Sequence, residues 1–261
     1  MTDRFKGEQG GWGYGCFFNK CRGVFSEVRG RSGVRFQCEM IRAFIFDVDG
    51  TLVDSVDAHA RSWVETLREF GHEVDFARVR YQIGKGGDQL MAEFLSKDEI
   101  KEKGEAIEEA RKKRYQKNYL PFIEGFPGTR QLFQMLRDKG MQVVLASSAH
   151  GEELDTYKRR AHIEGLVQDE TSKDDVDRSK PHPDIFQAAL KTLDGVSPEE
   201  ALVVGDSPWD AIAATKAGIR SVGVLCGGFA EKDLREAGFE QIFAGPEDLL
   251  ARVGEVRGVS V

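Results

Sequence analysis

Two carboxylates lie one residue apart in the stretch IFDVDGTLVDS, where Asp47 and Asp49 follow an apolar run and precede Gly50. Like charges at this spacing repel each other, and burial beside an apolar strand adds a cost of desolvation. We therefore expect a cation or a catalytic task to offset that cost. A carboxylate can attack phosphorus as a nucleophile, and a second one nearby can act as general acid for the leaving group.

Similar polar residues occur in three later stretches of the chain. QVVLASS ends in Ser147 and Ser148, SKPHPD contains Lys180, and ALVVGDSPWD contains Asp206 and Asp210. Three or four carboxylates that meet at one edge can bind a hard divalent cation such as Mg²⁺, which would neutralise their charge. A lysine and hydroxyl groups beside that cation suit the oxygens of a phosphate group.

These residues come together only if the strands before them lie side by side. Residues 41–47 form an apolar run of strand length, and apolar strands alternate with helices after Gly125. The predicted helices cover 128–140, 150–162, 183–195 and 208–218, and the predicted strands cover 141–148, 201–207 and 221–228, with a weak strand near 165–170. This alternation predicts an α/β fold whose parallel sheet is covered on both faces. Ligands bind such sheets beyond the carboxyl ends of the strands.

A helical segment, residues 56–122, interrupts this alternation. Apolar residues recur at helical spacing in 57–71 and in 88–99, and a charged helix is expected over 101–121. Within the segment, the loop IGKGGDQL precedes a helix and contains Lys85. The loop would face the site if the segment closed over it, so Lys85 is a candidate for substrate contact; a plain glycine-rich connector is the alternative.

The chain therefore divides into three predicted parts. We assign 40–55 and 123–252 to the α/β core, with 56–122 as an inserted α-helical cap. Residues 1–39 are rich in glycine and show no periodicity, which predicts a disordered N-terminal extension.

Bulk properties exclude some classes of partner. A net charge of −7 and a pI near 5.4 argue against a nucleic-acid partner held by a basic surface. The four cysteines match no zinc or disulfide framework, which fits a cytoplasmic protein. No apolar run reaches the roughly 18 residues needed to cross a membrane. Whether the protein is a monomer or a homodimer is left open.

Four stretches, DVDGTLVDS, VLASS, SKPHPDIF and VVGDSPWDA, resemble the successive motifs of the haloacid dehalogenase superfamily in order and spacing. With the helical insert after the first motif, residues 40–252 resemble the phosphoglycolate phosphatase and β-phosphoglucomutase branch. The resemblance implies a Rossmann-like core with a helical cap, Mg²⁺ as cofactor, and a small phosphorylated metabolite as substrate.

The resemblance also implies a role for each matching residue. Asp47 would be the nucleophile and a metal ligand, and Asp49 the acid/base, with its backbone carbonyl on the metal. Lys180 would bridge the nucleophile and the phosphate. The remaining assignments are Ser147 and Ser148 for the phosphoryl group, Thr51 for loop support, and Asp206 and Asp210 for Mg²⁺.

Three functions remain open. The first is a phosphatase that acts through an aspartyl-phosphate, the second a β-phosphoglucomutase-like isomerase, and the third a non-catalytic domain that binds phosphorylated ligands. Asp49 argues against the third, because binding alone needs no second acid. Gly205 argues against the second, because the mutases usually carry an acidic residue there. Taken singly, each motif also has a simpler explanation as a turn, a helix cap or a surface lysine.

Overall fold

The computed structural model describes residues 40–149, 151–172, 176 and 178–261. The predicted N-terminal extension, 1–39, and the first residue of the helix predicted over 150–162 lie outside the described residues. Within them, no helix is both long and apolar enough to cross a membrane.

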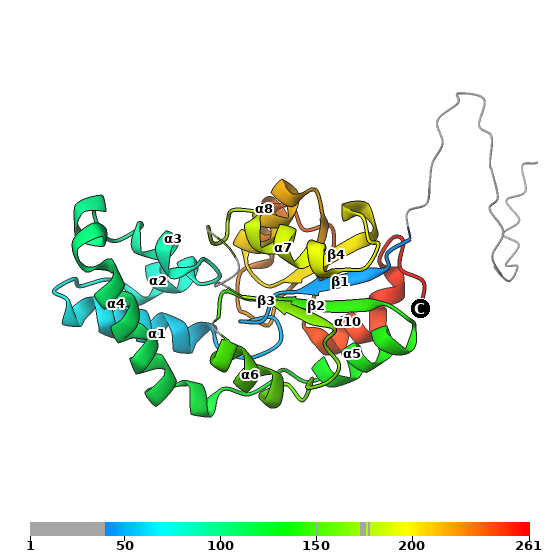
Figure 1. The fold of residues 1–261 in the computed structure, drawn as a ribbon, viewed down its shortest axis with the longest axis horizontal. Helices are drawn as coiled ribbons and strands as arrows, with labels where there is room; N and C mark the ends of the chain where they lie inside the picture. The colour runs from blue at the N-terminus through cyan, green and yellow to red at the C-terminus, as the bar shows by residue number, and fades with distance from the viewer. Residues whose placement is uncertain (1–39, 150, 173–175, 177) are drawn as a thin grey trace, which may run out of the picture. The chain divides into compact units, whose positions relative to one another are not determined.

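Six parallel strands form one sheet in the order β3-β2-β1-β4-β5-β6 (Figure 1). Their bounds are β1 Ala43–Phe46, β2 Gln142–Ala146, β3 Asp169–Thr171, β4 Ala201–Gly205, β5 Arg220–Val224 and β6 Ile242–Phe243. The last residue of β1, Phe46, is level with Leu145 of β2 and Val204 of β4. Strands β2 and β3 lie on one side of β1, and β4, β5 and β6 lie on the other. Ligands bind parallel sheets at the strand where the order changes direction in this way. The segments after β1, β2 and β4 therefore emerge next to one another.

Helices cover both faces of the sheet, because successive side chains of a strand point in opposite directions. Phe44 and Phe46 are buried with Phe133 of α5, whereas Ile45 is buried with Phe186 of α7. Helices α5 (Thr129–Asp138), α6 (Gly151–Arg160) and α10 (Pro246–Arg252) contribute to the first core; α7 (Asp184–Thr192) and α8 (Pro208–Ala217) contribute to the second. A further helix, α9 (Glu231–Ala237), packs against α8. The predicted α/β fold with a parallel sheet is confirmed.

Between β1 and β2 the described chain is helical. The elements are α1 Val56–Glu69, α2 Phe76–Gln82, α3 Gly87–Met91, α4 Lys97–Asn118 and the 3₁₀ helix η1 Leu120–Phe122. Their apolar side chains form a separate core that includes Trp63, Leu67 and Ile107. The predicted helix over 88–99 is wrong in extent. It ends at Met91, and Ser96 forms a reciprocal capping box with Glu99 that starts α4 instead.

The two chain segments that connect this helical region to the sheet run side by side. Asp54 N donates to Glu124 O at 2.9 Å, and Phe126 N donates to Leu52 O at the same distance. We therefore expect the two connections to move together if the helical region moves relative to the sheet. The division into cap and core remains a prediction.

Candidate active site

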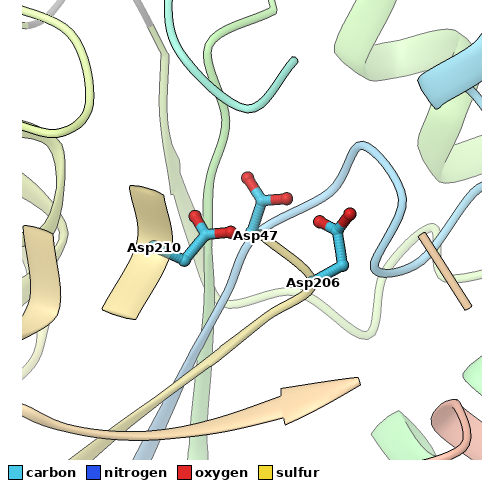
Figure 2. A group of neighbouring side chains, drawn as sticks. All are labelled: Asp47, Asp206 and Asp210. Atoms are coloured by element: carbon cyan, nitrogen blue, oxygen red, sulfur yellow. The ribbon is translucent and has the colours of Figure 1, made fainter. Parts of the chain in front are cut away.

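Three buried carboxylates meet at the carboxyl end of the sheet. Asp47 follows β1, Asp206 follows β4, and Asp210 lies in the first turn of α8 (Figure 2). One oxygen from each lies within 4.8 Å of the others, and none of the three residues is more than 4% exposed. Oxygen ligands at this spacing are those that a hard divalent cation prefers.

The turn after β1 determines how closely these groups approach. Gly50 has a φ of +79°, and a Cβ atom there would lie 2.3 Å from Asp206 Oδ2. Only glycine satisfies both conditions. Thr51 Oγ1 lies 3.2 Å from Asp47 Oδ2 and 3.1 Å from Asp206 Oδ1, and its single proton can be donated to only one of them at a time.

Lys180 is the cation of this cluster. Its side chain is 1% exposed, and its Nζ forms ion pairs with Asp47 Oδ1 and, at 2.8 Å, with Asp210 Oδ1. Burial alone would lower the pKa of Lys180, but the Asp210 and Asp47 carboxylates more than offset this and raise it. Lys180 is therefore fully protonated at neutral pH.

The single positive charge of Lys180 does not compensate the three carboxylates. Burial, together with the nearby Asp210 and Asp49 charges, raises the pKa of Asp47 from 3.8 to about 7 even though Lys180 opposes the shift. Burial and the Asp47 carboxylate also raise the pKa of Asp206 well above its usual value. Burial is the largest cause of both pKa shifts and the neighbouring carboxylates add to it, so a bound cation would oppose both shifts. The residues thus fit a divalent cation in number, donor type and charge.

The Asp49 carboxylate has different partners from the Asp47 carboxylate. Its Oδ1 accepts from Ser55 Oγ at 2.5 Å and lies 2.9 Å from His59 Nε2. Burial would raise the pKa of Asp49, but the His59 ring and the hydrogen bonds from His59 and Ser55 hold it below its ordinary value. The two carboxylates of the DVD sequence are therefore separated into different electrostatic environments.

Buried aromatic side chains surround His59. Its ring stacks on Tyr115 with 3.9 Å between centroids, and its Nε2 lies 3.1 Å from the Tyr157 hydroxyl. The hydroxyls of Tyr115 and Tyr157 are 2.5 Å apart, and Tyr157 donates to Glu153 Oε1 at 3.1 Å. These contacts fix the position of the His59 ring, which holds Asp49.

The two serines after β2 differ in their surroundings. Ser147 is fully buried, and its Oγ accepts from Ala149 N at 3.0 Å. Ser148 lines a cavity that also reaches Asp47 and Asp49. Their roles in holding a phosphoryl group remain predictions.

That cavity lies between the sheet end and the helical region. Its lining comprises Asp47, Asp49, His59, Trp63, Ile83, Gly84, Lys85, Gly86, Gly87, Glu108, Arg111, Ser148, Ala149 and Glu153. The space that water can reach inside is about 50 Å³, enough for only a few waters. A larger hollow of about 350 Å³ along α6 and β3 contains none of the predicted site residues, whereas Asp47, Asp49, Lys85 and Ser148 line the smaller one.

Hydrogen bonds also join the helical region to the chain after β4 and β5. On α2, Arg80 Nη2 donates to Gly227 O at 2.8 Å and Nη1 to Gly228 O at 3.3 Å. Trp209 Nε1 on α8 donates to Tyr81 O at 3.1 Å.

The comparisons with known proteins agree with this geometry. The sequence matches the family model of haloacid dehalogenase-like hydrolases over residues 41–218. It is 31% identical over 190 residues to phosphoglycolate phosphatase from Aquifex aeolicus, covering 72% of this chain and 86% of that protein. A solved hydrolase from Pseudomonas syringae superimposes with a TM-score of 0.75 at 29% identity, covering 82% of this chain and 98% of that one.

A third relative is much longer than this chain. Protein SUPPRESSOR OF QUENCHING 1, chloroplastic, from Arabidopsis thaliana is 32% identical over 205 residues, covering 76% of this chain but 19% of that protein. Since the family model covers more than half of the sequence, the chain belongs to the haloacid dehalogenase-like hydrolase family. The predicted family and the hydrolase class of enzyme are confirmed.

Sequence reasoning did not identify Arg111, Tyr115, Tyr157 or Glu153 as cavity or network residues. One signal was available. The buried positions of α4 are Gly104, Ile107, Arg111 and Tyr115, spaced three or four apart. An arginine in an otherwise buried helical stripe is unusual, and it marks a buried site.

Lys85 lines the cavity, but its ammonium group is already paired. Nζ lies 2.7 Å from Glu93 Oε1 and 4.1 Å from the centre of the Trp209 ring. We expect Lys85→Ala to lower kcat/KM modestly and by the same factor for a metabolite and for p-nitrophenyl phosphate, because it removes the contacts with Glu93 and Trp209 and no contact with substrate. Steady-state kinetics on both substrates measure this. A loss confined to the metabolite would instead support direct substrate contact.

Proposed function

We propose that the protein is a Mg²⁺-dependent phosphatase that hydrolyses a small phosphorylated metabolite through an aspartyl-phosphate on Asp47. The observation that carries this proposal is the separation of the two carboxylates. Asp47 lies in the cluster of Asp206, Asp210 and Lys180, whereas Asp49 faces the same cavity from the His59 network. A nucleophile and an acid/base need such different surroundings.

In the first step an Asp47 oxygen attacks phosphorus, and the bond to the leaving-group oxygen breaks as Asp49 gives that oxygen a proton. The negative phosphate group beside Asp49 raises the pKa of this carboxyl, which favours its protonation on substrate binding. In the second step Asp49 takes a proton from water, and the resulting hydroxide oxygen attacks phosphorus and releases Asp47. Lys180 holds the Asp47 carboxylate and the transferred group.

Mg²⁺ held by the Asp47, Asp206 and Asp210 carboxylates would supply charge stabilisation for the phosphoryl oxygens. The backbone carbonyl of Asp49 is proposed as a further ligand. Ser147 and Ser148 are proposed to contact the phosphoryl group.

Gly205 supports hydrolysis over the isomerase alternative. A Cβ atom at this position would lie 2.5 Å from Asp210 Cβ and 2.7 Å from Asp210 Oδ2. An acidic side chain of the mutase type would therefore displace Asp210 and its pairing with Lys180. The named Aquifex relative is a phosphatase, which agrees. A phosphoglycolate-like or sugar phosphate substrate, a cytoplasmic location and a monomeric or homodimeric state remain predictions.

The test is phosphate release from a set of phosphorylated metabolites and p-nitrophenyl phosphate, each with and without Mg²⁺. We expect release from several small monoesters only with Mg²⁺. Phosphate transfer between positions of a sugar phosphate, without net release, would favour the isomerase. Binding of phosphate esters without turnover would favour the non-catalytic domain.

A further inference from the structure

We propose that Tyr157 is a positioning residue for the acid step: its hydroxyl occupies the Glu153 carboxylate, which leaves the proton of His59 to Asp49. The inference rests on the proposed function, since it concerns how the leaving-group oxygen receives its proton. Tyr157 and Glu153 both lie on α6, outside the four stretches that carry the family resemblance.

The buried Tyr157 hydroxyl lies among three polar groups. Its oxygen is 3.1 Å from Glu153 Oε1, 2.5 Å from the Tyr115 hydroxyl and 3.1 Å from His59 Nε2. A hydroxyl donates one proton and accepts through its lone pairs, whereas a carboxylate only accepts. Tyr157 therefore donates its proton to Glu153, and its lone pairs face Tyr115 and His59.

His59 Nε2 has two carboxylates nearby that compete for its proton. Asp49 Oδ1 lies 2.9 Å away and Glu153 Oε1 lies 3.8 Å away. Because Tyr157 already donates to Glu153 Oε1, His59 donates to Asp49. Without the Tyr157 hydroxyl, Glu153 would be a buried carboxylate that has lost a donor, which is costly. His59 would then replace that donor at the expense of its bond to Asp49.

The bond from His59 determines which Asp49 oxygen delivers a proton. Ser55 Oγ at 2.5 Å and His59 Nε2 at 2.9 Å both contact Oδ1. Since both groups donate, the proton of the carboxyl form is on Oδ2. When an Asp47 oxygen attacks phosphorus, the bond to the leaving oxygen breaks, its electron pair stays on that oxygen, and the Oδ2 proton moves there. A carboxyl that has lost His59 can rotate, and the transfer then loses its orientation.

The experiment compares phenyl phosphate with p-nitrophenyl phosphate, two esters of similar shape. Phenol is a weaker acid than p-nitrophenol, so its ester depends more on a proton from the enzyme as the bond breaks. kcat/KM is measured with Mg²⁺ for wild type, Tyr157→Phe, Glu153→Gln and the double variant, which together form a double-mutant cycle. The ratio of kcat/KM for the two esters cancels any loss of folded enzyme.

We expect Tyr157→Phe to lower the ratio of phenyl to p-nitrophenyl phosphate about three- to tenfold, a part of the roughly 10²- to 10⁴-fold contribution of a general acid. Adding Glu153→Gln should restore most of the ratio, because a neutral amide competes less strongly for the His59 proton than a carboxylate. Tyr119→Phe is the control. It also removes a hydroxyl that donates to a carboxylate, Glu65 Oε1 at 2.7 Å, and it should not change the ratio.

Two results would overturn the inference. One is an unchanged ratio in Tyr157→Phe. The other is a ratio that falls in Tyr157→Phe and stays as low in the double variant, which would leave Tyr157 with a packing role alone. If wild-type protein with Mg²⁺ releases phosphate from neither ester and from no other phosphomonoester, the proposed function fails instead.

Discussion

Asp47→Asn is expected to lower kcat on p-nitrophenyl phosphate by about three orders of magnitude or more and to leave the protein folded. The amide removes the nucleophile, and loss of a covalent catalyst is typically this severe. Steady-state kinetics measure the loss, and circular dichroism checks the fold. Asp138→Asn is the control, since Asp138 is an exposed carboxylate that accepts a hydrogen bond from Gln134. Retention of more than about a tenth of wild-type activity would contradict the covalent mechanism.

The same variant has a predictable effect on stability. The folded-state pKa of Asp47 is raised from 3.8 to about 7. Between these two values the folded, metal-free protein binds more protons than the unfolded chain, so the contribution of Asp47 to the free energy of unfolding falls as pH rises from about 4 to about 7. The asparagine of the Asp47→Asn variant does not titrate, so the variant does not lose this part of the free energy of unfolding. The metal-free variant should therefore melt a few degrees higher than metal-free wild type at pH 8. The difference should shrink toward pH 4; a constant difference would contradict the assignment.

Removal of divalent metal is expected to abolish turnover, and Mg²⁺ is expected to restore it. The physical reason is the excess negative charge of the Asp47, Asp206 and Asp210 cluster, which Lys180 offsets in part. Phosphate release is measured after EDTA treatment and again after Mg²⁺ is added back. Ca²⁺ should inhibit, because its larger and more flexible coordination shell misplaces the nucleophile.

Thermal unfolding gives a readout of the metal that is independent of activity. A ligand that binds only the folded state at 100 times its dissociation constant contributes about 2.7 kcal/mol to stability. Mg²⁺ should therefore raise the melting temperature of wild type by several degrees and that of Asp206→Asn by much less. Full activity in EDTA, or an equal rise in both proteins, would remove the metal role from these carboxylates.

The sheet and the residues at its edge were predictable because each strand has a short local signature, an apolar run that ends in a polar residue. Apolar runs that end in Asp47, Ser147 and Asp206 mark three strands, and parallel α/β sheets bring such ends to one edge. The structure places β1, β2 and β4 next to one another, and Asp47, Asp206 and Asp210 meet there. The roles of these residues remain predictions.

The helical region was less predictable, since its contacts depend on how helices cross. The spacing of apolar residues in 88–99 suits one helix, but it does not show that Ser96 and Glu99 will cap a new one. Likewise, nothing local in the sequence reveals that Arg111 of α4 will meet His59 of α1 across 52 positions. Such contacts between helices are determined by tertiary packing, which the spacing of apolar residues within one helix does not reveal.

Arg80 of α2 donates hydrogen bonds to the backbone carbonyls of Gly227 and Gly228, after β5. A Cβ atom at Gly227 would lie 1.8 Å from Asp206 Oδ2, so the strand of backbone that Arg80 holds also packs directly on a proposed metal ligand. The attachment of the predicted cap and the position of a proposed metal ligand thus depend on one short loop. A bulky phosphorylated molecule that kept Arg80 away from this loop would leave the site incompletely assembled. The enzyme would in this way measure the size of its substrates, and phosphoproteins would escape hydrolysis even though their phosphate groups are chemically competent.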